Sequence, residues 1–409
     1  MDEAPGREAD LARALAAHDR WRSRGVFNLL PSENALSPTA RRYLSSDLAG
    51  RYTLPGEVEF GGEKISNSYG GTKFADQVEA IANGSAARLF HGRFATTRPL
   101  SGHVAAMAAL APLLPRGSKI LAIPPTQGGY DGYAPGFLPA LFGWNVRPLP
   151  ASGPGHLVVL EEALEEIRRE RPNAVLLGQS FFLFPYPLKE IAEEAHRLGS
   201  LVLYDASHVL GLIAGGEFQD PLREGADVLY GSTHKSLPGP QGGLIVSDRE
   251  ELFRQIDLSM TWRVLDNAHW NRIASLGQTL LELERFGPEY ARTIVGNSQA
   301  LGKALVEKGL PVIQGPDGFS RSHQLLLDRD VLRARHSVGP GELSLRWERS
   351  RLLTDRVGRL GTAEVARLGL TPEMMPRLAD LLVRSGLAKE RLAKEVASWR
   401  KEFRNLRFV

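Results

Sequence analysis

Two residues near the middle of the chain have side chains suited to carbonyl chemistry, and each follows a short apolar run. Asp205 ends the run that starts at Leu201, and Lys235 follows the segment 227–234. If these runs are neighbouring parallel strands, both side chains lie at the carboxyl edge of the sheet, where open α/β sheets bind ligands. An amine that forms a Schiff base and a carboxylate that pairs with a pyridinium nitrogen are what pyridoxal 5′-phosphate (PLP) requires. A surface lysine and a strand-end aspartate give the same pattern, so the pair alone does not decide.

Three further groups of residues could complete such a site. Ser101-Gly102-His103 opens a predicted helix, and a helix start with free N–H groups favours a phosphate. His208 follows Asp205 closely, and Ser180 ends the preceding apolar run, so both could reach a phenolic oxygen on the ring. Ordinary helix caps and satisfied buried polar groups remain the alternative explanation for each of them.

The elements that would position these residues follow from the hydrophobic pattern. Residues 8–23 predict a helix, and 27–75 are irregular, with many Gly, Pro and Ser. From residue 76, helical segments (76–90, 102–114) and short continuous apolar runs alternate, which predicts a mostly parallel sheet covered on both faces. We therefore expect an α/β fold with a seven-stranded large domain.

Beyond that sheet, the pattern predicts a long helix over 267–309 that leads to a second unit. This unit contains a strand at 323–328 and a basic final helix at 388–408, which we expect to pack an apolar stripe on the small domain. The expected organisation is an N-terminal helix and active-site or dimer arm (1–75), a large PLP-binding domain (76–283) and a small α/β C-terminal domain (284–409).

Composition excludes several classes of function. The 409 residues include 50 basic and 47 acidic side chains, so there is no charge excess that favours nucleic acid. There is no cysteine, which removes disulfides, thiolate catalysis and cysteine-ligated zinc, and we expect no metal. The first residues are acidic and lack an apolar core, and no apolar run is long enough to span a membrane. We expect a cytoplasmic protein.

Five ordered segments resemble the serine hydroxymethyltransferases, from about residue 28 to 383. The segment 227–243, which includes Ser232, His234 and Lys235, resembles that family's cofactor-lysine segment. The segments that begin at Asp205 and at Leu30, the latter with the Ser32-Glu33-Asn34 triplet, also resemble conserved stretches of the family. The remaining two are Tyr69-Gly-Gly71 with Asp76, and Arg359-Leu-Gly-Thr362. The resemblance implies the aspartate-aminotransferase-like fold of PLP-dependent transferases.

The resemblance also implies a role for each matched residue. Lys235 corresponds to the Schiff-base lysine, Asp205 to the partner of the ring nitrogen, and His234 to the histidine beside the lysine. Arg359 corresponds to the arginine that binds the substrate carboxylate, which suits its planar fork, and Ser32 lies beside it. The other implied cofactor contacts are Ser101, Gly102, His103, Tyr130, Ser180, His208 and Ser232. Tyr52 and Tyr69 match tyrosines that the partner subunit supplies in the family, so a homodimer with shared active sites is implied.

The sequence departs from the family on the side where folate is used. The family's glutamate, two residues after the first tyrosine, is replaced in Tyr52-Thr53-Leu54-Pro55 by leucine, which cannot transfer a proton. About seven extra residues follow, with Glu57, Glu59 and Glu63 as candidates to replace it. Tyr130 stands in place of the ring-stacking histidine. The segments 260–272 and 336–347 also differ from the family pattern.

We therefore expect a PLP enzyme that makes or breaks the Cα–Cβ bond of a β-hydroxy-α-amino acid through a glycine quinonoid. The expected type is an aldolase or transaldolase, with serine or threonine as donor and an aldehyde as acceptor. The alternative is tetrahydrofolate-dependent serine hydroxymethyl transfer. More distant alternatives are transamination, racemisation or decarboxylation at Cα, and a catalytically silent protein of this fold that binds a partner.

Overall fold

The computed structural model describes residues 4–153 and 155–409. A seven-stranded sheet forms the centre of the large domain, in the order β4-β10-β9-β8-β7-β5-β6. Only β10 runs against its neighbours, pairing antiparallel with β4 and β9. The mostly parallel α/β fold is therefore confirmed. The strands are β4 (Phe94–Thr96), β5 (Lys119–Ala122), β6 (Asn145–Pro148), β7 (Ala174–Leu177), β8 (Leu201–Asp205), β9 (Val228–Ser232) and β10 (Gly243–Ser247).

The central strand β7 is buried on both faces, which explains why it is apolar without interruption. On β7, Val175 and Leu177 enter one hydrophobic core, whereas Ala174 and Leu176 enter the core on the opposite face. Successive side chains of a strand point to opposite faces, so a doubly covered strand must be apolar at every position. The helices around the sheet are α3 (Lys73–Leu89), α4 (Gly102–Leu110), α5 (Leu138–Phe142), α6 (Leu160–Glu170), α7 (Leu188–Arg197), α8 (Leu210–Ala214) and α9 (Glu250–Ser259).

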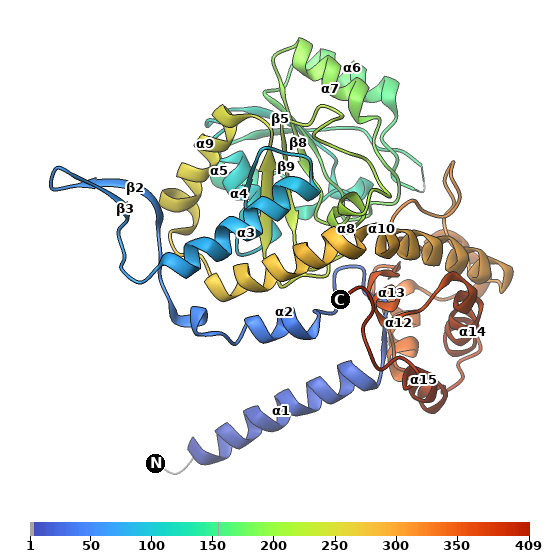
Figure 1. Ribbon diagram of the computed structural model, residues 1–409. Helices are drawn as coiled ribbons and strands as arrows, with labels where there is room; N and C mark the ends of the chain where they lie inside the picture. Colours follow the sequence, from blue (N-terminus) through green and yellow to red (C-terminus); the bar gives the residue numbers. More distant parts are fainter. Residues whose placement is uncertain (1–3, 154) are drawn as a thin grey trace.

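The long helix α10 (Trp270–Glu307) crosses from the large domain to the small one (Figure 1). Ile294 packs in the core of the large domain, whereas Leu301 and Leu305 pack in that of the small domain. The boundary that we expect at 283/284 thus falls inside one continuous helix, and the three-part division stays an expectation. The predicted helix over 267–309 is confirmed.

The small domain combines two short sheets with helices. Strand β1 (Phe27–Asn28) pairs with β12 (Leu352–Leu353), and β11 (Gln324–Leu326) pairs antiparallel with β13 (Arg359–Gly361). The predicted final helix is too long, because α15 spans only Ala393–Arg400 and residues 401–409 are not helical. Its apolar stripe is real, since Trp399 packs on Phe27. The other helices are α11 (Arg329–His336), α12 (Pro340–Arg349), α13 (Ala363–Leu368) and α14 (Met375–Gly386).

The N-terminal region has more regular structure than its composition predicts. Helix α1 (Ala4–Arg24) projects from the body and contacts it at its C-terminal end, where Arg22 pairs with Glu33, and α2 (Pro38–Tyr43) follows it (Figure 1). Residues that we expect to be irregular form a hairpin of β2 (Pro55–Phe60) and β3 (Glu63–Asn67), which extends away from the large domain. Its turn contains Gly61 and Gly62, both with positive φ, which is the hairpin signal within an apparently loop-like stretch. No helix among the described residues is long and apolar enough to cross a membrane.

Candidate active site

A pocket opens at the carboxyl ends of strands β7, β8 and β9. Asp205 is the last residue of β8, and Lys235 follows β9 in the adjoining loop, as expected for neighbouring parallel strands. Every residue that we assigned to the cofactor or to catalysis lines this pocket, together with Gln179 and Ser207, which we did not predict. The predicted lining residues are Ser101, Gly102, His103, Tyr130, Ser180, Asp205, His208, Ser232, His234 and Lys235.

The amine of Lys235 is held in a site that favours its neutral form. Burial lowers the pKa of Lys235 to about 8, nearby Asp205 opposes this shift, and Arg359 adds to it. The Nζ atom lies 3.2 Å from His208 Nε2. Burial, followed by the charge of Lys235, places the pKa of His208 well below its usual value, so the imidazole is neutral.

The orientation of His208 is fixed from the small domain. Gln324, at the start of β11, donates from Nε2 to His208 Nδ1 over 2.8 Å. This donor requires the ring proton to sit on Nε2, facing Lys235. His323 stacks on the His208 ring at 5.6 Å and hydrogen-bonds to the carbonyl of Pro31. Sequence reasoning missed Gln324, because the motif around it reads only as a buried strand.

Asp205 is buried and receives two hydrogen bonds. Its Oδ1 accepts from the backbone N–H of Ser207 over 3.0 Å, and its Oδ2 accepts from the hydroxyl of Tyr133 over 2.6 Å. The Tyr133 hydroxyl lies 2.7 Å from that of Tyr230. Neither tyrosine was predicted, because single buried aromatic residues carry no local signal.

The start of helix α4 packs closely against the ends of the neighbouring strands. Ser101 caps it, its side chain accepting from the N–H of Val104 over 3.1 Å. A Cβ added to Gly102 would lie 2.8 Å from the Cβ of Ser232 and 3.2 Å from Ser207 Oγ, so only glycine fits here. The predicted Ser101-Gly102 helix start therefore lies beside the strand ends that carry the other pocket residues, as a phosphate site requires.

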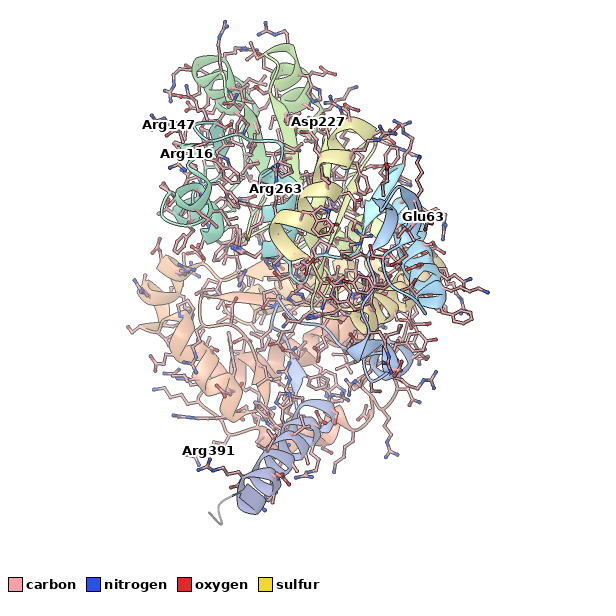
Figure 2. All side chains as sticks on the ribbon, turned by 90° about the vertical axis from the view of Figure 1, so that its left-hand side faces the viewer. Glu63, Arg116, Arg147, Asp227, Arg263 and Arg391 are labelled. Carbon is pink, nitrogen blue, oxygen red and sulfur yellow. The ribbon has the colours of Figure 1, made fainter. Side chains whose placement is uncertain are left out.

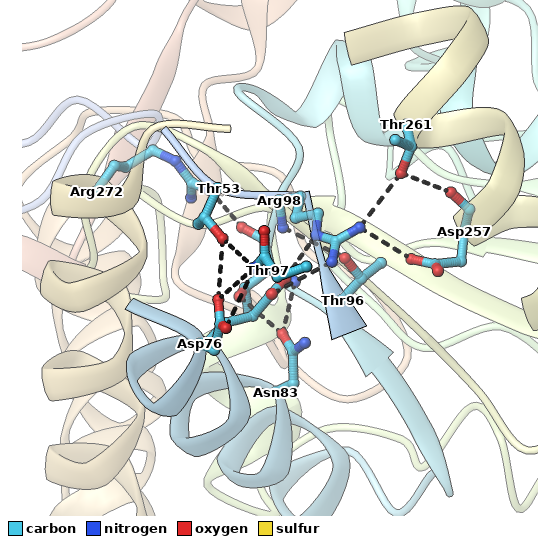
Figure 3. A network of polar contacts seen from close by, with 11 residues as sticks. Thr53, Asp76, Asn83, Thr96, Thr97, Arg98, Asp257, Thr261 and Arg272 are labelled. Carbon is cyan, nitrogen blue, oxygen red and sulfur yellow. Dashed lines mark hydrogen bonds and ion pairs between the residues drawn. The ribbon is translucent and has the colours of Figure 1, made fainter. Parts of the chain in front are cut away.

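The loop that enters α4 is fastened by a network of polar contacts (Figure 3). Both the N–H and the hydroxyl of Thr97 donate to Asn83 of α3, over 2.9 and 2.8 Å, and Thr97 O accepts from Arg272. Next to it, Arg98 pairs with Glu79 at 2.6 Å. This pair is largely buried and joins the loop to α3, so it fixes the helix start before any ligand binds.

Aromatic and imidazole groups form the outer wall of the pocket. The Tyr130 hydroxyl and His103 Nδ1 are 2.9 Å apart. Burial, with a contribution from Asp205, raises the pKa of the Tyr130 phenol, so it stays protonated. The buried Nδ1 of His234 has no hydrogen-bond partner among the described residues. An unpaired buried donor or acceptor at a pocket is costly unless a ligand satisfies it.

Arg359 lies next to this pocket, and its guanidinium already makes polar contacts with other residues of the protein. Its Nε pairs with Asp355 Oδ2 at 2.6 Å, and its Nη1 donates to the carbonyl of Ser180 over 2.7 Å. The guanidinium also lies 5.0 Å from the centre of the Phe181 ring. Close packing of Gly361 on Pro31 places the loop that contains Ser32 beside the strand of Arg359.

Tyr52 and Tyr69, like Ser32 and Arg359, are absent from the residues that line this chain's own pocket. Tyr52 and Tyr69 stack on each other at 4.6 Å, and the Tyr52 hydroxyl donates to Asp266 over 3.1 Å. The assignment of these tyrosines to a partner subunit's site stays a prediction.

The donor set fits PLP. A half-buried lysine with a lowered pKa suits the aldehyde, a buried carboxylate suits the ring nitrogen, and a helix start with a glycine that admits no Cβ suits the phosphate. The free His234 Nδ1 offers one further polar contact on the pocket wall.

Comparisons with known proteins agree with this reading. The family profile described as "Serine hydroxymethyltransferase" matches residues 7–334. A serine hydroxymethyltransferase from Korarchaeum cryptofilum is 36% identical over 432 residues, covering 100% of this chain and 97% of the relative. One from Methanopyrus kandleri is 35% identical, covering 97% of this chain and 94% of the relative.

A solved structure confirms the fold. The crystal structure of an L-threonine transaldolase from Pseudomonas fluorescens, in the internal aldimine state, matches with a TM-score of 0.88 at 24% identity. The match covers 100% of this chain and 96% of that one. At this identity the similarity bears on the fold alone. From the profile and the curated relatives together, the chain belongs to the serine hydroxymethyltransferase family of PLP-dependent transferases.

Proposed function

We propose that this enzyme makes or breaks the Cα–Cβ bond of a β-hydroxy-α-amino acid, with serine or threonine as donor and an aldehyde as acceptor. Lys235, Asp205 and the start of α4 at Ser101 and Gly102 are the residues we assign to holding PLP. Bound there, PLP supplies a place for the negative charge that develops at Cα. The contributions of the polypeptide are to bind the amino acid, to orient it and to move protons.

Holding the amine of Lys235 in position is the task we assign to His208. Its Nε2 lies 3.2 Å from Lys235 Nζ, and the bond from Gln324 fixes which ring nitrogen faces the lysine. With its proton on Nε2, the neutral imidazole can donate a hydrogen bond to the neutral amine of Lys235, and it places no second cation beside that amine. His208 therefore holds the lysine amine in place and favours its neutral, nucleophilic form.

We assign the substrate carboxylate to Arg359. Asp355 and the Ser180 carbonyl hold one edge of the guanidinium, while Phe181 supports its face. This leaves the Nη2 edge to bind a carboxylate in a fixed orientation. By fixing the carboxylate, Arg359 would fix the orientation of the amino acid about its Cα and so select which of its bonds reacts.

The observation that carries the choice of acceptor is the absence of a second acid. Among the described residues that line the pocket, Asp205 is the only carboxylate. Leu54 occupies the family's glutamate position, and Glu59 and Glu63 on the hairpin are exposed. Glu63 lies with Arg263 on the face toward which the hairpin extends (Figure 2). Positioned acid–base catalysis contributes about 10²–10⁴-fold, so this loss favours an acceptor that needs no such acid.

Serine hydroxymethyl transfer to tetrahydrofolate is the second candidate. It is favoured by the curated relatives at 34–36% identity, all of which carry the name serine hydroxymethyltransferase. Partner residues could also complete the pocket, and we propose a homodimer in which Tyr52 and Tyr69 face the other subunit's site. Their absence from this chain's own lining residues supports that arrangement.

The test is to incubate the holoenzyme with threonine or serine and to measure glycine and aldehyde, with and without tetrahydrofolate. Release of acetaldehyde from threonine without folate, or capture of an added aldehyde, is the expected result. Conversion of serine to glycine that strictly requires tetrahydrofolate would refute the proposal in favour of the second candidate. Formation of a keto acid, a D-amino acid or carbon dioxide would reveal transamination, racemisation or decarboxylation.

Two variants make this test specific. Lys235→Ala should abolish all turnover, and borohydride reduction of the wild-type holoenzyme should label Lys235. Leu54→Glu restores the family's acid at its own position. A gain of folate-dependent activity in that variant, without loss of aldehyde release, would confirm that Leu54 sets the choice of acceptor.

A further inference from the structure

A chain of two buried tyrosines ends on the carboxylate of Asp205. The Tyr133 hydroxyl lies 2.6 Å from Asp205 Oδ2, and the Tyr230 hydroxyl lies 2.7 Å from that of Tyr133. Tyr133 is 3% exposed and Tyr230 is 0% exposed. Tyr133 belongs to η3 (Asp131–Tyr133) and Tyr230 to β9, so the chain joins an outer loop to the centre of the sheet.

The chain has a definite direction. A phenol carries one proton to donate. Because the hydroxyl of Tyr133 donates its hydrogen bond to Asp205, its oxygen must accept the hydrogen bond from the hydroxyl of Tyr230. Two O–H groups therefore point in series toward the carboxylate, and hydrogen bonds in such a series strengthen each other in a low-dielectric interior.

The surroundings keep this series intact. Burial, and then the charge of Asp205, raises the pKa of both phenols well above the usual value, so they remain donors. The other groups whose charge interacts with Asp205 are Lys235 and the phenols of Tyr130, Tyr186 and Tyr204. The protein itself supplies donors to both oxygens of Asp205. The Tyr133 hydroxyl donates to Oδ2, and the backbone N–H of Ser207 donates to Oδ1.

We propose that Tyr133 and Tyr230 are positioning residues that hold the Asp205 carboxylate in one orientation, so that it pairs with the cofactor's protonated ring nitrogen. Hydrogen bonds to a carboxylate favour its charged form. A carboxylate fixed by these donors pairs with a protonated ring nitrogen, whereas a carboxylate without them loses that alignment. The inference deepens the proposed function, because it rests on Asp205 as the ring-nitrogen partner.

The neighbouring core contains a matched control. Tyr186 is 5% exposed, and the charge of Asp205 helps to raise the pKa of its phenol. Its hydroxyl, however, has no hydrogen-bond partner among the described residues. Tyr186→Phe therefore removes a buried hydroxyl near Asp205 without breaking the chain. Tyr133→Phe removes the direct donor, and Tyr230→Phe removes only the second link.

The experiment uses the holoenzyme reconstituted with PLP labelled with ¹⁵N in the ring. The nitrogen chemical shift reports whether the ring is protonated, independently of turnover. Hydrogen bonds to charged groups are among the stronger ones in proteins, so Tyr133→Phe should move the proton equilibrium toward the carboxylate by about tenfold or more. Tyr230→Phe should give a smaller shift in the same direction, and Tyr186→Phe should give none.

The apoenzyme provides a second reading. The ¹³C signal of the Asp205 carboxyl, assigned with Asp205→Asn, should change in Tyr133→Phe and Tyr230→Phe and stay constant in Tyr186→Phe. If Tyr133→Phe does not fold, Tyr230→Phe still decides, because it leaves the bond to Asp205 in place. Equal spectra for Tyr230→Phe and Tyr186→Phe would overturn the inference. A ring nitrogen unaffected by Asp205→Asn would instead refute the assignment of Asp205 in the proposed function.

Discussion

The state of Lys235 gives the sharpest quantitative prediction. Burial lowers its pKa to about 8, from 10.5 for a free lysine. At pH 7.5 an amine with a pKa of about 8 is roughly one-quarter neutral, whereas a free lysine is ~0.1% neutral. The apoenzyme should therefore present its reactive amine on the order of 200-fold more often than an ordinary lysine does. Its reactivity should rise with pH up to about 8 and level off above it, because only the neutral amine attacks an aldehyde.

Two substitutions should move this pKa in opposite directions. Asp205→Asn removes the charge that raises the pKa of Lys235, so the variant should have a lower value. Arg359→Gln removes a charge that lowers it, so that variant should have a higher value. Because burial is the largest cause, both variants should remain below 10.5.

The assay is competitive acetylation of the apoenzyme across pH, read by peptide mass spectrometry. Exposed lysines such as Lys401 provide the internal reference in the same sample. A pKa of Lys235 at or above 10, or shifts of the same sign in both variants, would refute the reasoning.

Three further outcomes are expected. Gln324→Glu should move the ring proton of His208 from Nε2 to Nδ1, because a carboxylate can only accept a hydrogen bond. ¹⁵N NMR of labelled histidine shows which ring nitrogen is protonated. An unchanged tautomer would contradict the role of Gln324. Arg359→Lys should weaken amino-acid binding about tenfold or more while PLP stays bound, as measured by titration of the visible spectrum. Burial lowers the pKa of His323 to about 3, so between pH 6.5 and 3 the unfolded chain binds more protons than the folded one. The free energy of unfolding therefore decreases as the pH is lowered through this range, by about 2 kcal/mol at pH 5. Urea unfolding should show a smaller acid loss in His323→Asn, and an equal loss would exclude this residue.

The catalytic side of the pocket was predictable because its signals are local. Asp205 and Lys235 each follow an apolar strand, and strand ends of a parallel sheet meet at one edge. The start of α4 was predictable for a similar reason, since Ser101 and Gly102 are a recognisable helix cap. In these cases a few consecutive residues determine both the element and its place in the sheet.

The N-terminal region shows where that approach fails. Residues 55–67 read as loop because glycine and charged residues dominate, yet they pair as a hairpin around Gly61 and Gly62. The final helix was predicted too long because its apolar spacing continues to Leu406, whereas the chain leaves the helix after Arg400. In that tail Arg407 N donates to Arg367 O, a tertiary contact that periodicity cannot reveal.

The groups that adjust the catalytic residues were unpredictable for a deeper physical reason. Gln324 lies 116 residues from His208, and Tyr133 lies 72 residues from Asp205. A buried polar side chain must find a partner wherever the fold brings one, and the identity of that partner follows from tertiary packing instead of local spacing. Yet the partner decides which nitrogen of His208 carries a proton and how the charge of Asp205 is stabilised. The sequence thus identifies the groups that react, while the fold determines the protonation states in which they react, and the Tyr133, Tyr230 and Gln324 variants test that second level directly.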